Sequence, residues 1–307
     1  MSYLLGLDLG GTSVKGVAVS TNGETLARFH EPFELSQPMA FAAAVSRTLD
    51  QATGAHGSPL RVGLSAPGIA ARDGSCISFM PGRFEGLEGL IWGERLGREE
   101  GVPVLNDAHA ALLGEVWLGA AQNAQDAILL TLGTGVGGAV LANGSLLLGH
   151  GGKAGHLGHI SLNPDGPADI CQTPGSLEDA IGNNNIRERS SARFQTTHEL
   201  IAVHEQGDPQ ATEIWMRSVK SLAAAIASLG NVLDPEMVIL GGGIARSGRT
   251  LLDPLESYLD TMEWRPGGRR LRLVLAMLGD LAGAYGAAHN ALIRTNPSTI
   301  LNAVSRT

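Results

Sequence analysis

The sequence predicts a two-lobed α/β fold with a duplicated strand-hairpin core and a cleft between the lobes. Two observations support this prediction. A unit of strand, glycine turn, strand, Asn-Gly turn and strand begins near residue 3 and occurs again from residue 127. Helical patterns alternate with short buried-strand patterns between the two copies and after the second. We expect an N-terminal lobe of residues 1–117 and a C-terminal lobe of residues 118–307, with the last segment packing back on the N-terminal lobe.

Composition and charge exclude several classes of protein. Of the 307 residues 43% are hydrophobic, which is enough for a buried core and excludes a disordered chain. The net charge of −8 argues against general binding to nucleic acids or anionic membranes. No apolar run reaches the roughly 18 residues that cross a bilayer, and the N-terminus lacks a signal-peptide pattern. We expect a cytoplasmic enzyme with no nucleic-acid or membrane partner.

The two copies of the repeated unit are built from the same local signals. In the first copy one strand ends at Gly10-Gly11 and the next ends at the hairpin signal Asn22-Gly23. In the second copy Gly133-Thr134-Gly135 and Asn143-Gly144 take the same two places. The expected strands are 3–9, 14–20 and 24–29 in the first copy, and 127–132, 136–142 and 145–148 in the second.

The remaining elements follow from periodicity and end signals along the chain. They are a helix over 39–52, strands over 60–65 and 102–105, a helix from Asn106-Asp107 to Leu118, helices over 195–205 and 208–230, a strand over 237–240 and a helix over 281–293. The glycine-rich stretch from 149 to 182 is expected to be irregular.

Three glycine turns that follow strands are candidates for phosphate binding. They are Gly10-Gly11-Thr12, Gly133-Thr134-Gly135 and Gly241-Gly242-Gly243. Such a turn exposes backbone N–H groups without side-chain bulk, although any one of them alone is more often an ordinary hairpin. Three of them in a duplicated frame favour a nucleotide site. The dinucleotide fingerprint is matched only formally at Gly133, because a strand rather than a helix follows.

Two acidic positions are candidates for chemistry on a phosphate. Asp8 lies at the end of an apolar strand, where a carboxylate either is bonded by the amides of the next turn or faces hydrated Mg²⁺ on a nucleotide. Asn106 and Asp107 lie where a strand meets a helix, so one of them is expected to cap the helix. A carboxylate left over at this position could accept a hydroxyl proton as the hydroxyl attacks phosphorus.

His156, His159 and Glu178 form a third group of polar candidates. Two histidines three residues apart could bind a metal on a helix, but the glycines around them argue against helical structure. We favour contacts to sugar hydroxyls, because these side chains supply both donors and acceptors.

The motifs together resemble those of sugar kinases of the ROK family, within the actin-like ATPase superfamily that includes hexokinase. They are Leu7-Asp8-Leu9-Gly10-Gly11-Thr12, Ala66-Pro67-Gly68, Leu105-Asn106-Asp107-Ala108 with Gly114-Glu115, Leu132-Gly133-Thr134-Gly135-Val136-Gly137-Gly138, Gly155-His156-Leu157-Gly158-His159, Gly241-Gly242-Gly243 and Ala282-Gly283-Ala284. The similarity extends from residue 3 to residue 293. It implies the ribonuclease H-like fold of that superfamily, the use of ATP and Mg²⁺, and a homodimer.

The resemblance also assigns a role to each candidate residue. It implies that Asp107 is the catalytic base. It implies a sugar site made by Asn106, His156, His159, Glu178, Pro67 and Gly68. It implies an ATP site, with Mg²⁺ carried by ATP near Asp8, made by Asp8, Gly10, Gly11, Thr12, Lys15, Gly133, Thr134, Gly135, Gly242 and Gly243.

The sequence departs from the family pattern in ways that bear on substrate and metal. His156 stands where members usually have Glu, which changes the hydrogen bonds available to sugar hydroxyls. Many members bind structural zinc through the histidine at the position of His159 and three cysteines, of which only Cys171 is present. We therefore expect no structural zinc. Because the first phosphate strand starts at Tyr3, we expect no helix-turn-helix module of the kind found in repressors of the family.

The expected activity is ATP-dependent phosphorylation of a hexose hydroxyl, with glucose as the default acceptor and a sugar 6-phosphate as the product. A kinase for N-acetylmannosamine, N-acetylglucosamine or another hexose is the alternative within the family. A sugar-binding sensor without catalysis is a third interpretation, which the presence of both Asp8 and Asp107 disfavours.

Overall fold

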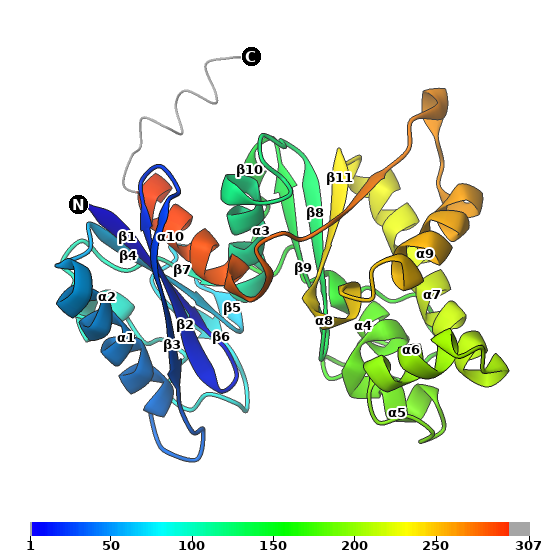
Figure 1. Ribbon diagram of the computed structural model, residues 1–307, viewed down its shortest axis with the longest axis horizontal. Helices are drawn as coiled ribbons and strands as arrows, with labels where there is room; N and C mark the ends of the chain where they lie inside the picture. The colour runs from blue at the N-terminus through cyan, green and yellow to red at the C-terminus, as the bar shows by residue number, and fades with distance from the viewer. Residues whose placement is uncertain (1, 295–307) are drawn as a thin grey trace. The chain divides into compact units, whose positions relative to one another are not determined.

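The computed structural model describes residues 2–294, which form two compact units, each built around its own sheet (Figure 1). The first unit comprises residues 2–123, Leu146–Ala154 and 277–294. The second unit comprises Ala124–Ser145 and Gly155–Ala276. The chain therefore leaves the first unit and returns to it twice.

Every strand and helix expected from the sequence is present, together with several that were not predicted. The strands are β1 (Tyr3–Leu9), β2 (Ser13–Ser20), β3 (Thr25–Pro32), β4 (Arg61–Ala66), β5 (Ile69–Ala70), β6 (Ile77–Phe79), β7 (Val104–Asn106), β8 (Ala127–Leu132), β9 (Val136–Ala142), β10 (Ser145–Leu146), β11 (Met237–Gly241) and β12 (Arg272–Leu275). The α-helices are α1 (Ala40–His56), α2 (Trp92–Arg95), α3 (Asp107–Leu118), α4 (Leu177–Ile181), α5 (Ile186–Arg189), α6 (Thr197–Glu205), α7 (Pro209–Leu233), α8 (Gly242–Ala245), α9 (Arg249–Met262) and α10 (Ala282–Arg294). The 3₁₀ turns are η1 (Leu157–His159), η2 (Asn183–Asn185), η3 (Pro266–Gly268) and η4 (Gly279–Leu281).

The two sheets share one topology. The strand order is β3-β2-β1-β4-β7 in the first unit and β10-β9-β8-β11-β12 in the second. In each sheet the central strand pairs antiparallel with the strand that follows it and parallel with a strand from later in the chain. The predicted mixed α/β fold with a duplicated core is therefore confirmed.

The first unit continues past the expected boundary at residue 117 to Asn123, and it also contains Leu146–Ala154, which the sequence analysis assigned to the second lobe. Helix α10 belongs to the first unit too, as expected for the last segment. It packs on β1, β4 and α3 and covers the face of the first sheet opposite to α1 (Figure 1). The last described helix of the chain thus completes a unit that begins with the first strand.

The alternation of side chains along β1 explains how the first sheet can have a core on one face and a polar position on the other. The residues that join the α1-side core are Tyr3, Leu5, Leu7 and Leu9. Leu4 packs instead with Ala284 and Ala288 of α10. Gly6 and Asp8 follow Leu4 at intervals of two and therefore face α10 as well.

Glycines allow α10 to lie directly on the sheet backbone. A Cβ at Gly6 would meet the carbonyl oxygen of Ala284, and a Cβ at Gly63 of β4 would meet that of Ala287. A larger side chain at either strand position would push the helix away from the sheet. The start of α10 is thereby held beside the end of β1, where Asp8 lies.

The second unit is held by helices that pack on one hydrophobic core with its sheet. The long helix α7 has an apolar stripe and contributes the fully buried Trp215, whose indole N–H donates a 3.1 Å hydrogen bond to the carbonyl of Thr250. The unpredicted helix α9 adds Leu251, Leu255 and Leu259 to the same core. Across the described residues, no helix combines the length and the apolar character needed to span a membrane.

Candidate active site

Asp8 is positioned in the first unit by groups from β4 and α10. Ser65 of β4 is its neighbour in the parallel register, and the Ser65 hydroxyl donates a 2.6 Å hydrogen bond to Oδ1 of Asp8. Gly283 in the first turn of α10 leaves room for the carboxylate, because a Cβ there would lie only 2.7 Å from the same oxygen. Among the described residues, the hydrogen bond to Asp8 comes from a side chain rather than from the amides of the glycine turn.

The Asp8 side chain is partly buried, with its carboxyl group turned toward the interior of the unit, and this changes its acidity. Burial raises its pKa to about 6, the Ser65 hydrogen bond lowers it, and the negative charge of Asp107 raises it. Lys15, the cross-strand partner of Asp8, lowers it, but the Lys15 ammonium is ion-paired with Asp280 at 3.6 Å. A cation brought to this position would stabilise the ionised form of Asp8, which suits hydrated Mg²⁺.

The first glycine turn combines backbone donors with a cationic side chain. The N–H of Gly10 closes the turn on the carbonyl of Ser13 at 3.0 Å. Within the described part of the chain, the N–H groups of Gly11 and Thr12 make no hydrogen bond. The guanidinium of Arg83 lies directly against Gly11, where an added Cβ would collide with it. Donors and a cation at one turn suit a phosphate group.

Asn106 and Asp107 have different environments at the junction of β7 and α3. Oδ1 of Asn106 accepts hydrogen bonds from the N–H groups of Ala108 and His109 at 3.0 and 3.3 Å, so the buried Asn106 is the N-cap. Asp107 is exposed on the first helical turn, where its Oδ1 accepts from the N–H of Ala108 at 2.8 Å. The carboxylate, and not the amide, is therefore the group presented at the start of α3, as a catalytic base requires.

Pro67 and Gly68 form the sharp turn between β4 and β5. Gly68 has φ +102°, and a Cβ there would lie 2.7 Å from the carbonyl oxygen of Phe79, so glycine is required. The Gly68 carbonyl accepts a 3.0 Å hydrogen bond from Nδ2 of Asn106. With Oδ1 used in capping, Asn106 has one N–H left for a ligand, which limits the contacts it can offer a sugar.

The second glycine turn is anchored through its backbone in the second unit. The N–H of Gly133 donates to the carbonyl of Gly135 at 2.9 Å. The carbonyls of Gly133 and Thr134 accept hydrogen bonds from the N–H groups of Asn183 and Asn184 at 3.0 and 2.8 Å. Because the carbonyls of Gly133 and Thr134 are both bonded, the turn is held in one conformation.

Glu178, the predicted sugar ligand on α4, lies directly against this second turn. Its Oε2 accepts a 2.9 Å hydrogen bond from the N–H of Val136, and its Oε1 accepts a 3.1 Å hydrogen bond from Nδ2 of Asn184. A Cβ added to Gly135 would collide with Oε2. The predicted phosphate turn and the predicted sugar ligand are therefore in contact, which the sequence did not reveal.

The third glycine turn lies at the end of β11. Gly242 has φ +85°, and a Cβ there would meet the carbonyl oxygen of Leu132, so this position also requires glycine. The carbonyl of Gly243 lies 3.3 Å from Nε2 of His198 on α6. The structure thus places Gly242 and Gly243 beside the strand that precedes the second glycine turn.

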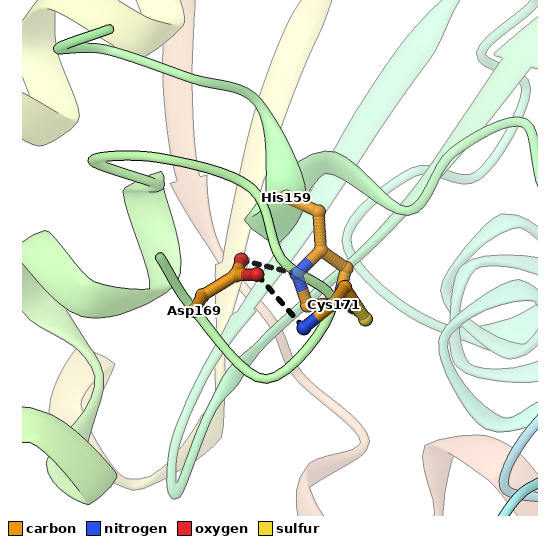
Figure 2. Close-up of side chains that lie close together, drawn as sticks. All are labelled: His159, Asp169 and Cys171. Atoms are coloured by element: carbon orange, nitrogen blue, oxygen red, sulfur yellow. Dashed lines mark hydrogen bonds and ion pairs between the residues drawn. The ribbon is translucent and has the colours of Figure 1, made fainter. Parts of the chain in front are cut away.

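His156 directly precedes the 3₁₀ turn η1, and His159 is the last residue of that turn. The structure pairs His159 with two residues of the following loop. Figure 2 shows the imidazole between Asp169 and Cys171. Nδ1 of His159 lies 2.7 Å from Oδ2 of Asp169, and Nε2 lies 3.5 Å from Sγ of Cys171. Asp169 was not among the predicted site residues, because nothing in its local sequence marks it as the partner of a histidine ten residues earlier.

His159, Asp169 and Cys171 bring three possible metal ligands within 4.8 Å of one another. Counting cysteines alone therefore missed Asp169 as a possible ligand. The donors nevertheless do not fit one tetrahedral zinc ion, because the carboxylate and the thiol lie at different ring nitrogens of His159. A single ion can bind only one of these nitrogens. The absence of structural zinc stays a prediction that metal analysis can test.

Each unit thus gathers part of the predicted site. The first unit brings together Asp8, Lys15, the first glycine turn and Asp107, and the second brings Glu178 to the second glycine turn. Sequence reasoning missed Ser65 and Arg83, whose contacts with Asp8 and Gly11 depend on strand register and on a distant loop. The only signal for Ser65 was its place near the end of a neighbouring buried strand.

Comparison with known proteins identifies the family. The model of the ROK family matches residues 4–294, nearly the whole of the described chain. The chain belongs to the ROK family. The predicted family is therefore confirmed, together with the fold that this membership implies.

Among curated relatives, the glucokinase of Halalkalibacterium halodurans is 30% identical over 309 residues, covering 92% of this chain and 93% of the relative. The N-acetylmannosamine kinase of Shigella flexneri is 30% identical over 294 residues, covering 93% of this chain and 97% of the relative. The two relatives have equal identity, so overall similarity does not choose between their sugars.

Solved structures of the family have the same fold. The ROK hexokinase of Thermus thermophilus superposes with a TM-score of 0.83 at 31% identity, covering 96% of this chain and 99% of the other. A ROK glucokinase of Streptomyces griseus in complex with glucose and AMPPNP superposes with a TM-score of 0.78 at 27% identity, covering 95% of this chain and all of the other, 100%.

Proposed function

We propose that the protein transfers the γ-phosphoryl group of ATP to the 6-hydroxyl of a hexose, with glucose as the first acceptor to test. That the protein is a sugar phosphotransferase follows from its family and its relatives. The observation that carries the specific mechanism is the exposed Asp107 carboxylate on the first turn of α3, whose charge acts on the partly buried Asp8.

Asp107 is the general base in this proposal. A carboxylate at the N-terminal turn of a helix is favoured in its ionised form, because the helix dipole stabilises negative charge there. Ionised Asp107 orients the sugar hydroxyl and accepts its proton as the oxygen attacks phosphorus. Asn106 supports this role by capping α3, which fixes the backbone that carries Asp107.

Asp8 and the glycine turns bind the nucleotide in this proposal. When bound with ATP, Mg²⁺ would neutralise charge on the phosphate oxygens, and Asp8 is the residue that would face it. The uncommitted N–H groups of the first turn and the Arg83 guanidinium offer further partners for phosphate oxygens. The glucokinase solved with AMPPNP, an analogue of ATP, supports ATP as the phosphoryl donor.

His156, His159 and Glu178 bind sugar hydroxyls in this proposal. Glucose is the first choice because several relatives are glucokinases. N-acetylmannosamine is the second candidate, because a relative of equal identity phosphorylates that sugar according to its name. A cytoplasmic location and a homodimer also belong to this proposal, and light scattering of the purified protein would measure the oligomeric state.

The test is a coupled assay with ATP and Mg²⁺ over a panel of hexoses and N-acetylhexosamines, run on the wild type and on Asp107→Asn. We expect phosphorylation of at least one sugar and a kcat for the variant that is lower by ~10²–10⁴, the usual loss for a general base. The Kd for the sugar should change little, since the amide keeps the shape of the carboxylate.

Asp50→Asn is the matched control, because Asp50 is an exposed aspartate on α1 and should leave kcat unchanged. If Asp107→Asn retains more than about a tenth of the wild-type kcat, Asp107 is not the base. If no sugar in the panel is phosphorylated by the wild type, the proposed reaction is wrong.

A further inference from the structure

The Asp169 carboxylate is the centre of the loop that follows η1. Its side chain is fully buried, and Oδ1 accepts hydrogen bonds from the N–H groups of Cys171 and Thr173 at 2.8 and 2.9 Å. Oδ2 faces Nδ1 of His159 at 2.7 Å, and the Ser176 hydroxyl also bonds to the carboxylate. Four partners, from η1, the loop and the start of α4, thus bond to one carboxylate.

These hydrogen bonds keep Asp169 ionised. Burial alone would raise its pKa, but the hydrogen bonds from His159, Thr173, Ser176 and Cys171 outweigh it and leave the pKa below the usual value. An ionised carboxylate can only accept hydrogen bonds. The proton between Asp169 and His159 is therefore on Nδ1 of the imidazole.

The proton on Nδ1 determines what the other ring nitrogen can do. In a neutral imidazole with Nδ1 protonated, Nε2 is an acceptor. The position of Cys171 agrees with this assignment, because its Sγ lies 3.5 Å from Nε2, where a thiol S–H can donate to an acceptor nitrogen. His159 is about a quarter exposed, so a ligand hydroxyl can replace the thiol at Nε2.

We propose that Asp169 is a positioning residue that holds His159, without a metal ion, in the tautomer with Nδ1 protonated, so that Nε2 accepts a hydrogen bond from a sugar hydroxyl. This inference rests on the proposed function for the identity of the ligand. Asp169 occupies the loop in which the family resemblance led us to consider zinc. The carboxylate bonds to the histidine and to the loop N–H groups, and so holds together a loop that would otherwise need a metal ion to hold it.

Replacing Asp169 with Asn should change the tautomer of His159 while keeping the hydrogen bonds that hold the loop. The Oδ1 atom of an asparagine can still accept from Cys171 and Thr173, but its amide N–H₂ is a donor. Nδ1 of His159 must then become the acceptor, and the proton of the neutral ring moves to Nε2. A sugar hydroxyl that donates to Nε2 in the wild type would meet a second donor in the variant.

The experiment records ¹⁵N NMR spectra of histidine-labelled wild type, Asp169→Asn and the control Asp165→Asn, which removes an exposed carboxylate from the same loop. His159→Gln assigns the His159 signals. We expect an Nδ1–H tautomer in the wild type and the control, and an Nε2–H tautomer in Asp169→Asn. The Kd for the preferred sugar should rise roughly 5- to 20-fold in that variant alone, the loss of one hydrogen bond. The KM for ATP should be unchanged.

Several outcomes overturn the proposal. They are an Nε2–H tautomer in the wild type, an unchanged tautomer in Asp169→Asn, a changed tautomer with an unchanged sugar Kd, or about one zinc ion per chain in protein purified without added metal. If Asp169→Asn does not fold, the wild-type spectrum and the metal analysis still decide. If no sugar is phosphorylated, the proposed function fails, whereas the spectra still show whether Asp169 sets the tautomer of His159.

Discussion

Asp8 shows how a single residue can be costly to the fold and useful to the site. Its place at the end of an apolar strand predicted a carboxylate in need of a partner, and that position is correct. The structure adds that the partner is the neutral hydroxyl of Ser65, which cannot neutralise the charge. A pKa of about 6 is the consequence of this incomplete compensation.

Asp8→Asn should therefore stabilise the protein at neutral pH while impairing nucleotide binding. A carboxyl whose folded-state pKa is raised destabilises the fold increasingly as pH rises from about 4 to about 6. We expect urea unfolding to show a gain of about 1–3 kcal/mol for Asp8→Asn at pH 7. The gain should fall to about 0.5 kcal/mol near pH 4, where Asp8 is protonated in the folded protein and only partly ionised in the unfolded chain.

The same variant should raise the KM for MgATP, because the amide cannot supply a negative charge to Mg²⁺. For the wild type, the KM for MgATP should rise as the pH falls below about 6, because Asp8 becomes protonated there. If Asp8→Asn is instead less stable than the wild type by the same amount at pH 4 and at pH 7, Asp8 affects stability only through its hydrogen bond to Ser65.

At the residue scale, the sequence could place groups that are close along the chain but not groups brought together by folding. Asn106 and Asp107 could be interpreted as a helix cap and a carboxylate left over beside it, because both positions depend on one helix start. Arg83 and Asp169 were not, because their contacts with Gly11 and His159 join separate loops. Residue type alone gives no signal for such pairs.

The second glycine turn shows that one element can serve two predicted subsites. Gly135 touches the carboxylate of Glu178, whereas a Cβ at Gly133 would have nothing within 4 Å. The two glycines of the turn are therefore not equivalent. The contact with Glu178 leaves no room for a side chain at position 135, whereas a side chain at position 133 would extend into open space.

Gly135→Ala should therefore impair sugar binding, because its methyl group would displace the Glu178 carboxylate. We expect the KM for the sugar to rise by roughly tenfold, the loss of about one hydrogen bond. Gly133→Ala is the matched control and should leave the KM for the sugar unchanged. A sugar KM that is the same in both variants would mean that Glu178 tolerates displacement or does not bind the sugar.

At the element scale, the sequence predicted the long regular elements and missed the short or interrupted ones. The β5–β6 hairpin and β12 have two to four residues each, too few for a clear alternation. Helix α9 has a clear stripe of Leu251, Leu255 and Leu259, but Pro254 within it is a signal that argues against a helix. Tertiary packing on α7 overrides that signal.

At the scale of the whole molecule, the first unit is assembled from both ends of the described chain. Helix α10 contacts β1, β4 and α3, and its approach depends on strand glycines. A Cβ at Gly63 would meet the backbone of Ala287 and lie 3.2 Å from Cβ of Ala291. Neither the helix nor the sheet can move away without opening the core of the unit.

Gly63→Ala should destabilise the protein by about 1–3 kcal/mol through overpacking. Gly54→Ala in α1 is the matched control, because a Cβ there has nothing within 4 Å and alanine is the better helix former. We expect this control to gain about 0.5–1 kcal/mol. Urea unfolding followed by circular dichroism measures the free energy of unfolding of both variants. Equal changes in that free energy for the two substitutions would contradict tight contact between α10 and the sheet.

The position of α10 also has a consequence for the order of events during synthesis. At typical elongation rates of 5–20 residues per second, roughly 15 to 60 s separate the emergence of β1 from that of α10. During that time the nascent first sheet would have its α10 face uncovered, with Leu4, Val17 and Val19 without the helix that buries them. The second unit, whose last segment ends at Ala276, can finish folding first, although its strands are made later. The oldest part of the chain is thus the last to be completed, and chaperones that shield exposed strands should act on it most.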